Sequence, residues 1–89
     1  MLTETITIIN KRGLHARAAA KLATTAAQFG ARIQVSTGSH WVEAKSVMSL
    51  MLLAATIGTD LQVSTEGEDE AAAMAAVKAL IEDRFEEEE

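Results

Sequence analysis

The spacing of apolar residues predicts four β-strands. Apolar and polar residues alternate from Leu2 to Ile9, within residues 32–36 and 40–44, and again from Leu61 onward. Residues 37–39 contain a glycine and are few enough to form a hairpin turn between the second and third strands. The apolar residues expected to face inward are Ile33, Val35, Val42, Leu61 and Val63, and one face of the first strand carries Ile6 and Ile8.

Apolar residues at steps of three and four predict three helices. The first runs from Ala16 to about Phe29 and ends at Gly30. The second spans about two turns from Val47 to Ala54, with Ser46 as its N-cap. The third follows Asp69, which is expected to cap it, and carries an apolar stripe of Met74, Val77, Leu80 and Ile81. The four final glutamates are expected to be frayed and solvated.

These elements occur in the order strand, helix, strand, strand, helix, strand, helix. Four alternating strands and three amphipathic helices imply an α+β fold, in which helices cover one face of a sheet and water meets the other. The length of 89 residues allows one hydrophobic core but not a second independent unit. We therefore expect residues 1–89 to form a single domain.

Composition excludes several classes of protein. The chain has no cysteine, so disulfides, thiolate nucleophiles and cysteine-based metal sites are ruled out. The first residues lack the basic and apolar regions of a signal peptide, and no apolar run reaches the roughly 18 residues of a membrane span. We expect a soluble, cytoplasmic protein that does not insert into membranes.

The net charge of −5 conceals an uneven distribution. Residues 1–59 hold six basic and two acidic residues, whereas residues 60–89 hold two basic and eleven acidic residues. Half of the basic residues lie around His15, namely Lys11, Arg12, Arg17 and Lys21. This cluster favours an anionic group or an acidic partner. Nucleic acid is disfavoured, because the overall balance is acidic and few aromatic side chains could stack on bases.

His15 directly precedes the first predicted helix, at a position where Asn, Asp, Ser or Thr would be better caps. A helix N-terminus offers unpaired N–H groups and partial positive charge, which bind phosphate and keep an imidazole neutral. A neutral ring nitrogen with a free lone pair is a nucleophile, and Arg17 can bind phosphoryl oxygens. These groups would support phosphoryl transfer, a reaction that depends mostly on placement and cationic support.

Spacing alone leaves other interpretations open. His15 can be an ordinary surface histidine, and Arg17 with Lys21 can form a solvated helix face. A metal site has little support, because His40 is the only other histidine and no carboxylate lies at helical ligand spacing from His15. The sequence also lacks the serine elbow of hydrolases and the glycine-rich phosphate loop of nucleotide-binding proteins.

Two motifs resemble those of a known family. Residues 13–20, GLHARAAA, resemble the active-site signature of HPr, the histidine-containing phosphocarrier family of the bacterial phosphotransferase system. Residues 44–54, AKSVMSLMLLA, resemble the serine-centred signature of that family, and residues 65–82 also resemble it. The first motif departs from the family at Ala18, where proline is usual. Alanine is an excellent helix former, so the helix should still begin there.

The resemblance implies an open-faced β-sandwich with a four-stranded antiparallel sheet and βαββαβα order. It implies that His15 carries a phosphoryl group on Nδ1, received from phosphorylated enzyme I and passed to a sugar-specific enzyme IIA, with Arg17 attending the phosphate. Such a protein needs no metal or cofactor of its own, and is a phosphorylated carrier rather than a self-contained enzyme. We expect it to be a monomer.

The second motif raises two further expectations. Ser46 can cap its helix and, by the resemblance, can also be phosphorylated by an HPr kinase/phosphorylase that regulates carbon use. The second predicted helix has too many apolar residues to bury on one side, so some of them should face outward. The resemblance places a docking surface for enzyme I and enzyme IIA at Ala20, Val47, Met48 and Met51, beside Arg17.

An alternative function comes from a different class of protein. The chain could be an HPr-like regulatory binding module that docks to a kinase or a transcription factor, with phosphorylation as its switch. Such a module would belong to a nitrogen-type phosphotransferase branch or to carbon catabolite regulation. The sequence is compatible with both the sugar branch and the nitrogen-type branch.

Overall fold

A computed structural model gives the fold of residues 1–88. One antiparallel sheet has the strand order β1-β4-β2-β3. Its strands are β1 (Leu2–Thr7), β2 (Arg32–Ser36), β3 (Trp41–Glu43) and β4 (Asp60–Glu66). The helices are α1 (Ala16–Ala27), α2 (Val47–Leu52) and α3 (Glu70–Glu82), followed by the short 3-10 helix η1 (Arg84–Glu86). The predicted α+β fold and the βαββαβα order are therefore confirmed.

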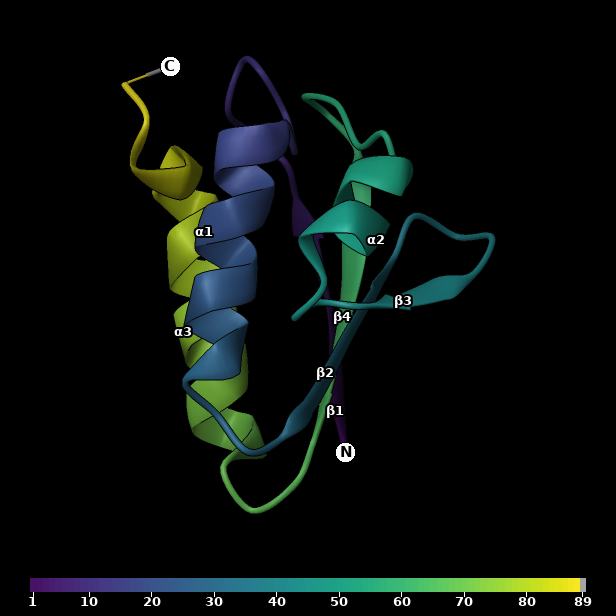
Figure 1. Cartoon of the computed structure of the whole chain (residues 1–89), viewed down its shortest axis with the longest axis vertical. Coiled ribbons are helices and arrows are strands. Elements are labelled where there is room, and N and C mark those ends of the chain that lie inside the picture. The colour runs from purple at the N-terminus through teal and green to yellow at the C-terminus, as the bar shows by residue number, and fades with distance from the viewer. Residues whose placement is uncertain (89) are drawn as a thin grey trace.

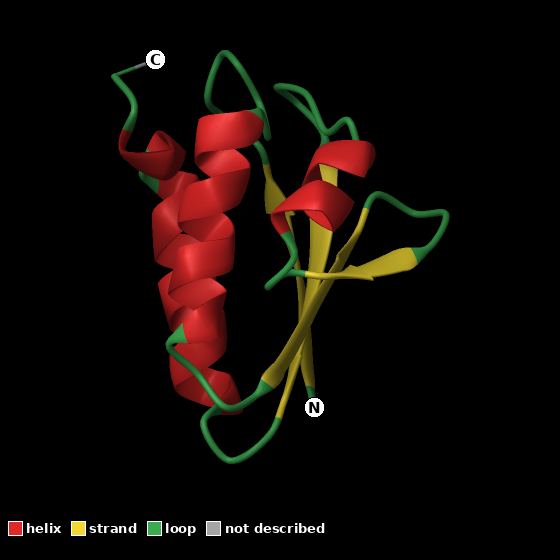
Figure 2. Ribbon diagram, in the orientation of Figure 1, coloured by secondary structure: helices red, strands yellow, loops and turns green. Residues whose placement is uncertain are grey.

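The helices lie on one side of the sheet (Figure 1). In Figure 2, α1 and α3 run side by side along the sheet, while the shorter α2 lies next to β3. The start of α1 and the C-terminal segment lie at the same end of the molecule, opposite the N-terminus. Topology therefore brings the last residues of the chain close to the loop that precedes α1.

The hydrophobic core fills the space between the sheet and the helices. The central strands contribute four fully buried side chains, Ile33, Val35, Leu61 and Val63, as predicted. Val42, on the edge strand β3, is half-buried and packs against the margin of the core. Burying one aliphatic side chain contributes about 1.5–3 kcal/mol, so this alternating pattern fixes which face of each strand turns inward.

Asp69 does not cap α3 in the way that the sequence predicted. It occupies the N-cap position, but its side chain makes no capping hydrogen bond. Its carboxylate instead accepts hydrogen bonds from the backbone N–H groups of Gly30 (2.9 Å) and Ala31 (2.8 Å). These amides follow the end of α1, so Asp69 connects the α1–β2 loop to the start of α3. Tertiary contact has replaced the local cap.

The prediction that the four final glutamates are frayed and solvated was wrong for Glu86 and Glu87, which the fold holds in place. Phe85 is fully buried, and the segment that follows α3 turns back toward the start of α1. The Nζ atom of Lys21 donates to the carbonyl of Phe85 (3.1 Å) and pairs with the carboxylate of Glu86 (3.1 Å). Glu87 is half-buried. A buried aromatic anchor therefore holds the acidic run, whose last residue lies outside the described part of the chain.

Gly13 allows the loop before α1 to pack closely against the loop after α2. Its φ of +68° lies in the left-handed region, and an added Cβ would be 2.5 Å from the carbonyl oxygen of Ala55. The next residue, Leu14, donates its backbone N–H to the same carbonyl at 2.9 Å. Only glycine combines this conformation with this approach, so Gly13 fixes the position of the residues that follow it.

We predict that Gly13→Ala lowers the free energy of unfolding by about 3 kcal/mol, because it adds both left-handed strain and a backbone clash. Denaturant unfolding of the two proteins measures this loss. Gly30→Ala is the matched control, because an added methyl group there meets open space. The control should change stability by less than about 0.5 kcal/mol. Equal stabilities of wild type and Gly13→Ala would show that the loop can move aside.

Candidate functional site

His15 occupies the N-cap of α1, at the start of the first helix as the sequence predicted. Its backbone is extended, and its carbonyl accepts the first helical hydrogen bond from the N–H of Ala19 at 2.8 Å. The imidazole makes no capping hydrogen bond, and the first turn contains no acidic residue. The amide end of the helix is therefore open, and its partial positive charge is not neutralised by the helix itself.

The loop before His15 is fixed by Asn10. This side chain is fully buried, and its Nδ2 atom donates to the carbonyl of Gly13 at 2.8 Å. The backbone closes a turn over the same residues, because the N–H of Gly13 donates to the carbonyl of Asn10 at 3.1 Å. Leu14 is buried in the core. The position of His15 is thus fixed by the hydrogen bonds between Asn10 and Gly13 and by the burial of Leu14.

The half-buried imidazole of His15 contacts the C-terminal segment through one ring nitrogen. Its Nε2 atom contacts Oε2 of Glu87, while Oε1 of the same carboxylate accepts a hydrogen bond from Nδ2 of Asn10 at 3.0 Å. Within residues 1–88, the other ring nitrogen, Nδ1, has no hydrogen-bond partner. The ring is therefore held at its Nε2 edge.

Glu87 is the charged partner in this contact. Desolvation by itself would raise the pKa of Glu87, but hydrogen bonds from Asn10 and His15 and attraction to His15 and Arg12 outweigh it and lower that pKa. The group is therefore a carboxylate at neutral pH. Because a carboxylate can only accept hydrogen bonds, the proton between the two groups belongs to Nε2 of His15.

Arg17 lies in the first turn of α1 with its side chain exposed. It lines a surface hollow together with Arg12 and three of the C-terminal glutamates, Glu86, Glu87 and Glu88. In the described part of the chain, Arg17 makes no hydrogen bond or ion pair. Its guanidinium is therefore available to an anion, although the three carboxylates weaken the local positive potential.

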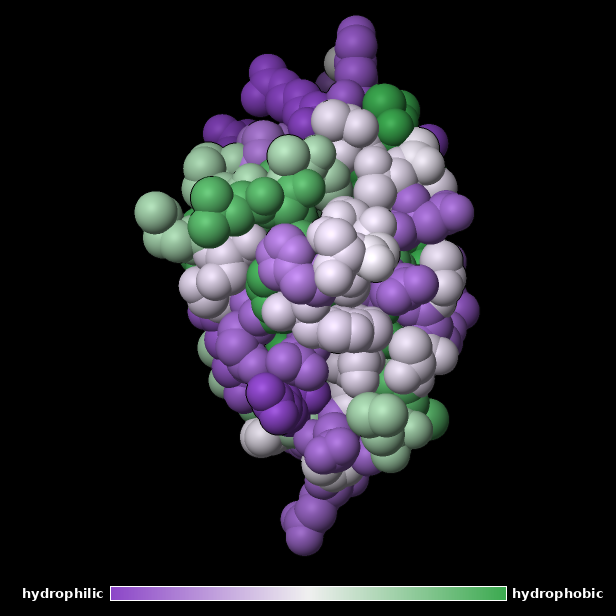
Figure 3. Space-filling view, turned by 90° about the vertical axis from the view of Figure 1, so that its right-hand side faces the viewer, coloured by the Kyte–Doolittle hydropathy of each residue, from purple (hydrophilic) through white to green (hydrophobic). Residues whose placement is uncertain are grey.

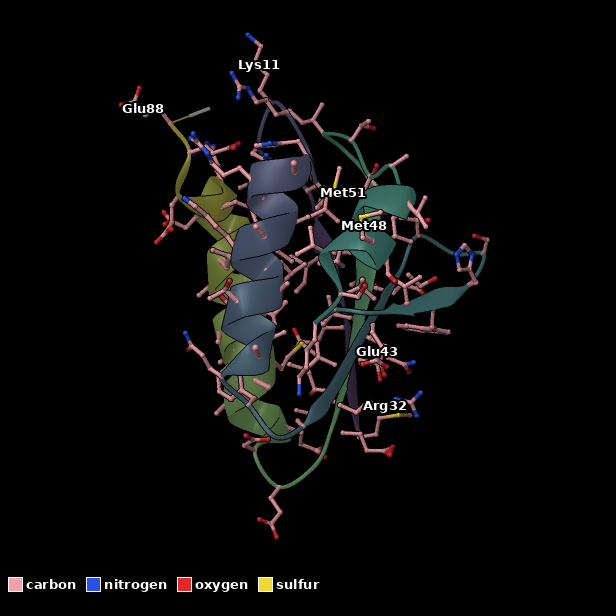
Figure 4. The ribbon with its side chains drawn as sticks, in the orientation of Figure 1. Lys11, Arg32, Glu43, Met48, Met51 and Glu88 are labelled. Carbon is pink, nitrogen blue, oxygen red and sulfur yellow. The ribbon has the colours of Figure 1, made fainter. Side chains whose placement is uncertain are left out.

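The basic and acidic segments meet at this end of the molecule. Figure 4 places Lys11, on the loop before α1, and Glu88, in the C-terminal segment, at the end where α1 begins. The uneven charge distribution of the sequence is thus partly cancelled by the fold. An incoming anion meets cations and carboxylates together rather than a purely basic patch.

Ser46 caps α2, as the sequence predicted. Its Oγ atom accepts a hydrogen bond from the backbone N–H of Ser49 at 3.3 Å. The side chain is half-buried, so it lies at the surface beside the first turn of the helix. It is therefore both a structural cap and a hydroxyl near solvent.

The prediction that some apolar residues of α2 face outward is confirmed. Leu50 is fully buried and Val47 is partly buried, whereas Met48 is 73% exposed and Met51 is 44% exposed. Figure 4 shows both methionines extending from α2, and Figure 3 shows an apolar region on the upper part of that face. Ala20, on the neighbouring α1, is exposed as well.

Sequence reasoning missed several residues around these two sites. Leu52 and Ile57 are exposed apolar residues within and after α2. Asn10 and Glu87, which hold the imidazole, were also not identified. Phe85 was the available signal, because a single aromatic residue among acidic ones indicates an anchored segment rather than a solvated tail.

A metal site and a membrane span were both disfavoured by the sequence. In residues 1–88, no three histidine, aspartate or glutamate side chains are grouped so that they could hold a metal ion. His40 is exposed after the β2–β3 turn, where its Nδ1 atom lies 3.1 Å from the hydroxyl of Ser39. None of the described helices is both long enough and apolar enough to cross a membrane.

Comparison with known proteins identifies what the chain resembles. A family model described as the phosphotransferase-system HPr component phosphorylation site matches residues 2–83. The chain is 49% identical over 87 residues to phosphocarrier protein HPr of Xylella fastidiosa strain Temecula1, and the match covers 98% of both chains. It is likewise 49% identical over 85 residues to phosphocarrier protein HPr of Cupriavidus necator, covering 96% of both.

Solved structures agree with these relatives. The crystal structure of HPr-C-His from Thermoanaerobacter tengcongensis matches with a TM-score of 0.95 and 44% identity, covering 100% of both chains. The solution structure of Crh, the Bacillus subtilis catabolite repression HPr, matches with a TM-score of 0.66 and 32% identity, covering 90% of this chain and 95% of that one.

Proposed function

The chain belongs to the HPr family of phosphocarrier proteins of the phosphotransferase system, and we propose that His15 is the residue that carries the phosphoryl group. Nδ1 of His15 accepts this group from phosphorylated enzyme I and later passes it to an enzyme IIA. The observation that supports the proposal best is the ring itself, held at Nε2 with Nδ1 unpartnered within residues 1–88, at the uncapped start of α1.

The surrounding groups suit this chemistry. The lone pair of Nδ1 attacks phosphorus, and charge develops on the phosphoryl oxygens as the bond to the donor breaks. The open N–H groups of α1 and the exposed guanidinium of Arg17 can stabilise that charge. The reaction needs no metal or cofactor of this protein, because the phosphoryl group arrives on an activated donor.

We further propose that residues 1–89 act as one domain and one copy in the cytoplasm. A continuous hydrophobic core that includes residues from Ile6 to Phe85 supports the single domain. A carrier that meets enzyme I and enzyme IIA in turn must dissociate from each of them. A small monomer that presents one reactive side chain suits such brief encounters.

Phosphorylation by enzyme I and phosphoenolpyruvate should add one acid-labile phosphoryl group to the wild type and none to His15→Ala. His40→Ala is the matched control, because it removes the other histidine of the chain, and it should be labelled like the wild type. Intact-mass spectrometry of the three proteins measures this. Labelling of His15→Ala would assign the phosphoryl group to a different residue and refute the proposal.

We propose that the exposed apolar surface of α2 and the adjoining part of α1 receives the partner proteins. This docking surface comprises the exposed residues Ala20, Met48 and Met51 together with Val47, which is partly buried. An exposed apolar surface on a small protein commonly marks an interaction site, and flexible methionine side chains can adapt to more than one partner. Because α1 and α2 pack against each other, a partner bound here lies close to the helix that begins at His15.

Met48→Glu should raise the KM for transfer from enzyme I at least tenfold while leaving thermal stability almost unchanged, because a 73% exposed side chain contributes little to the core. Steady-state transfer assays and thermal unfolding measure the two effects. Leu2→Glu is the matched control: it also turns an exposed apolar residue into an acid, on β1 away from α2. A large loss of stability in Met48→Glu would instead place Met48 among the core residues.

Ser46 is the proposed site of regulation, with an HPr kinase/phosphorylase as its partner. Its hydroxyl lies at the first turn of α2, two residues before Met48. A phosphate at this position would put up to two negative charges beside the apolar docking surface, and desolvation would then oppose partner binding. The similarity to Crh, which is described as a catabolite repression HPr, favours such regulation as a second function.

Two substitutions at Ser46 should separate its roles. Ser46→Ala removes the cap and should cost about 1 kcal/mol of stability, while transfer from enzyme I continues. Ser46→Asp can still cap the helix and should keep stability, but its charge should slow transfer. Denaturant unfolding and transfer kinetics measure the two effects. Normal transfer by Ser46→Asp would argue against regulation by charge at this position.

A further inference from the structure

We propose that Glu87 is a positioning residue for phosphoryl transfer through His15, an inference that rests on the proposed function. The carboxylate of Glu87 accepts a hydrogen bond from Nε2–H of His15 and so keeps the lone pair of the ring on Nδ1. It also stabilises the positive charge that the ring acquires when Nδ1 bonds to phosphorus.

The contact itself determines the state of the ring. Oε2 of Glu87 meets Nε2 of His15, and a carboxylate has no hydrogen to donate. The hydrogen bond at one ring nitrogen decides which tautomer a neutral imidazole adopts. With Nε2 protonated, Nδ1 carries the lone pair, and within residues 1–88 nothing else occupies it.

Asn10 fixes the orientation of the carboxylate. Its amide donates to Oε1 of Glu87 at 3.0 Å and to the carbonyl of Gly13 at 2.8 Å. Because Asn10 is fully buried, the surrounding side chains keep its amide in one position, and the hydrogen bond from that amide orients the carboxylate of Glu87. Both oxygens of Glu87 are therefore engaged, one by the interior of the protein and the other by His15.

An unusual backbone conformation in the C-terminal segment determines the position of Glu87. Three successive residues, Arg84, Phe85 and Glu86, have φ values of 55°, 53° and 65°. Non-glycine residues adopt this left-handed conformation at a cost in free energy, so it persists only where surrounding contacts enforce it. The buried ring of Phe85 and the bonds from Lys21 supply those contacts. Glu87 is thus held in place and is not part of a loose tail.

Phosphoryl transfer to His15 exchanges one bond to phosphorus for another. The lone pair of Nδ1 forms a bond to phosphorus, while the bond from phosphorus to the donor atom of enzyme I breaks and leaves its electron pair on that donor. The ring, which keeps its proton on Nε2, becomes positively charged. The carboxylate of Glu87 faces this charge across a charge-assisted hydrogen bond, so it stabilises the phosphorylated ring more than the neutral one.

Glu87→Gln tests the charge, because glutamine has a similar size and keeps one of the two acceptor oxygens. We expect kcat for transfer from enzyme I to fall roughly tenfold, with an unchanged KM, since one charge-assisted hydrogen bond becomes neutral. For Glu87→Ala, kcat should fall further than for Glu87→Gln. The matched control is Glu82→Gln, which removes a charge from an exposed position at the end of α3 and should behave as wild type.

Proton–nitrogen NMR of unphosphorylated protein gives a readout that a purely structural role would not move. The Nε2-bound proton of His15 should be visible in wild type, weaker in Glu87→Gln and lost by exchange in Glu87→Ala, while all three proteins stay folded. Unchanged kcat in both Glu87 variants would overturn the proposal. Faster transfer would also overturn it, because Glu87 would then be a gate that blocks the site.

The two proposals fail in different ways. If Glu87 variants transfer normally while His15→Ala takes no label, the carrier function stands and only the role of Glu87 is lost. If wild-type protein takes no phosphoryl group from enzyme I, the proposed function fails, and the role of Glu87 in transfer fails with it. The NMR signal of the Nε2 contact would persist in that case, because it does not depend on enzyme I.

Discussion

The placement of His15 depends on one buried amide, that of Asn10. Its Nδ2 atom donates to the loop before α1 through the carbonyl of Gly13 and to the C-terminal segment through Glu87. Its Oδ1 atom is buried without a partner within residues 1–88, and an unsatisfied buried acceptor costs about 1–3 kcal/mol. The two donated hydrogen bonds offset this cost. They also connect the loop before α1 with the C-terminal segment, which are far apart in the sequence and both lie next to the imidazole.

The charge around His15 differs from the net charge of the molecule, which is −5. The loop and first turn that surround His15 are basic, while the segment that folds over them is acidic. Each carboxylate there reduces the long-range attraction for an anion, but the carboxylate of Glu87 meets the ring only at Nε2. A phosphocarrier must release its cargo as readily as it accepts it. A site of mixed charge binds phosphate less tightly than a purely basic one and so suits transfer in both directions.

The fold brings the two family motifs next to each other, because α1 and α2 pack against each other. The first motif places His15 at the start of α1, and the second places Ser46 and the exposed methionines on α2. In the proposed function, a partner that covers the methionines also approaches the phosphorylated ring. A charge at Ser46 can then influence transfer without touching His15. One surface would serve docking, chemistry and regulation.

The sequence by itself determined the elements, the inward faces of the strands, and His15 and Ser46 as residues at the starts of helices, because periodicity and capping act over a few neighbouring residues. It also predicted that the second helix exposes apolar side chains, since a helix of about two turns cannot bury so many of them on one side. Tertiary structure alone decided that Asp69 binds Gly30 and Ala31, and that Phe85 folds the acidic segment onto the site. Those contacts join residues far apart in the chain. Local patterns carry no information about which distant partner completes a hydrogen bond.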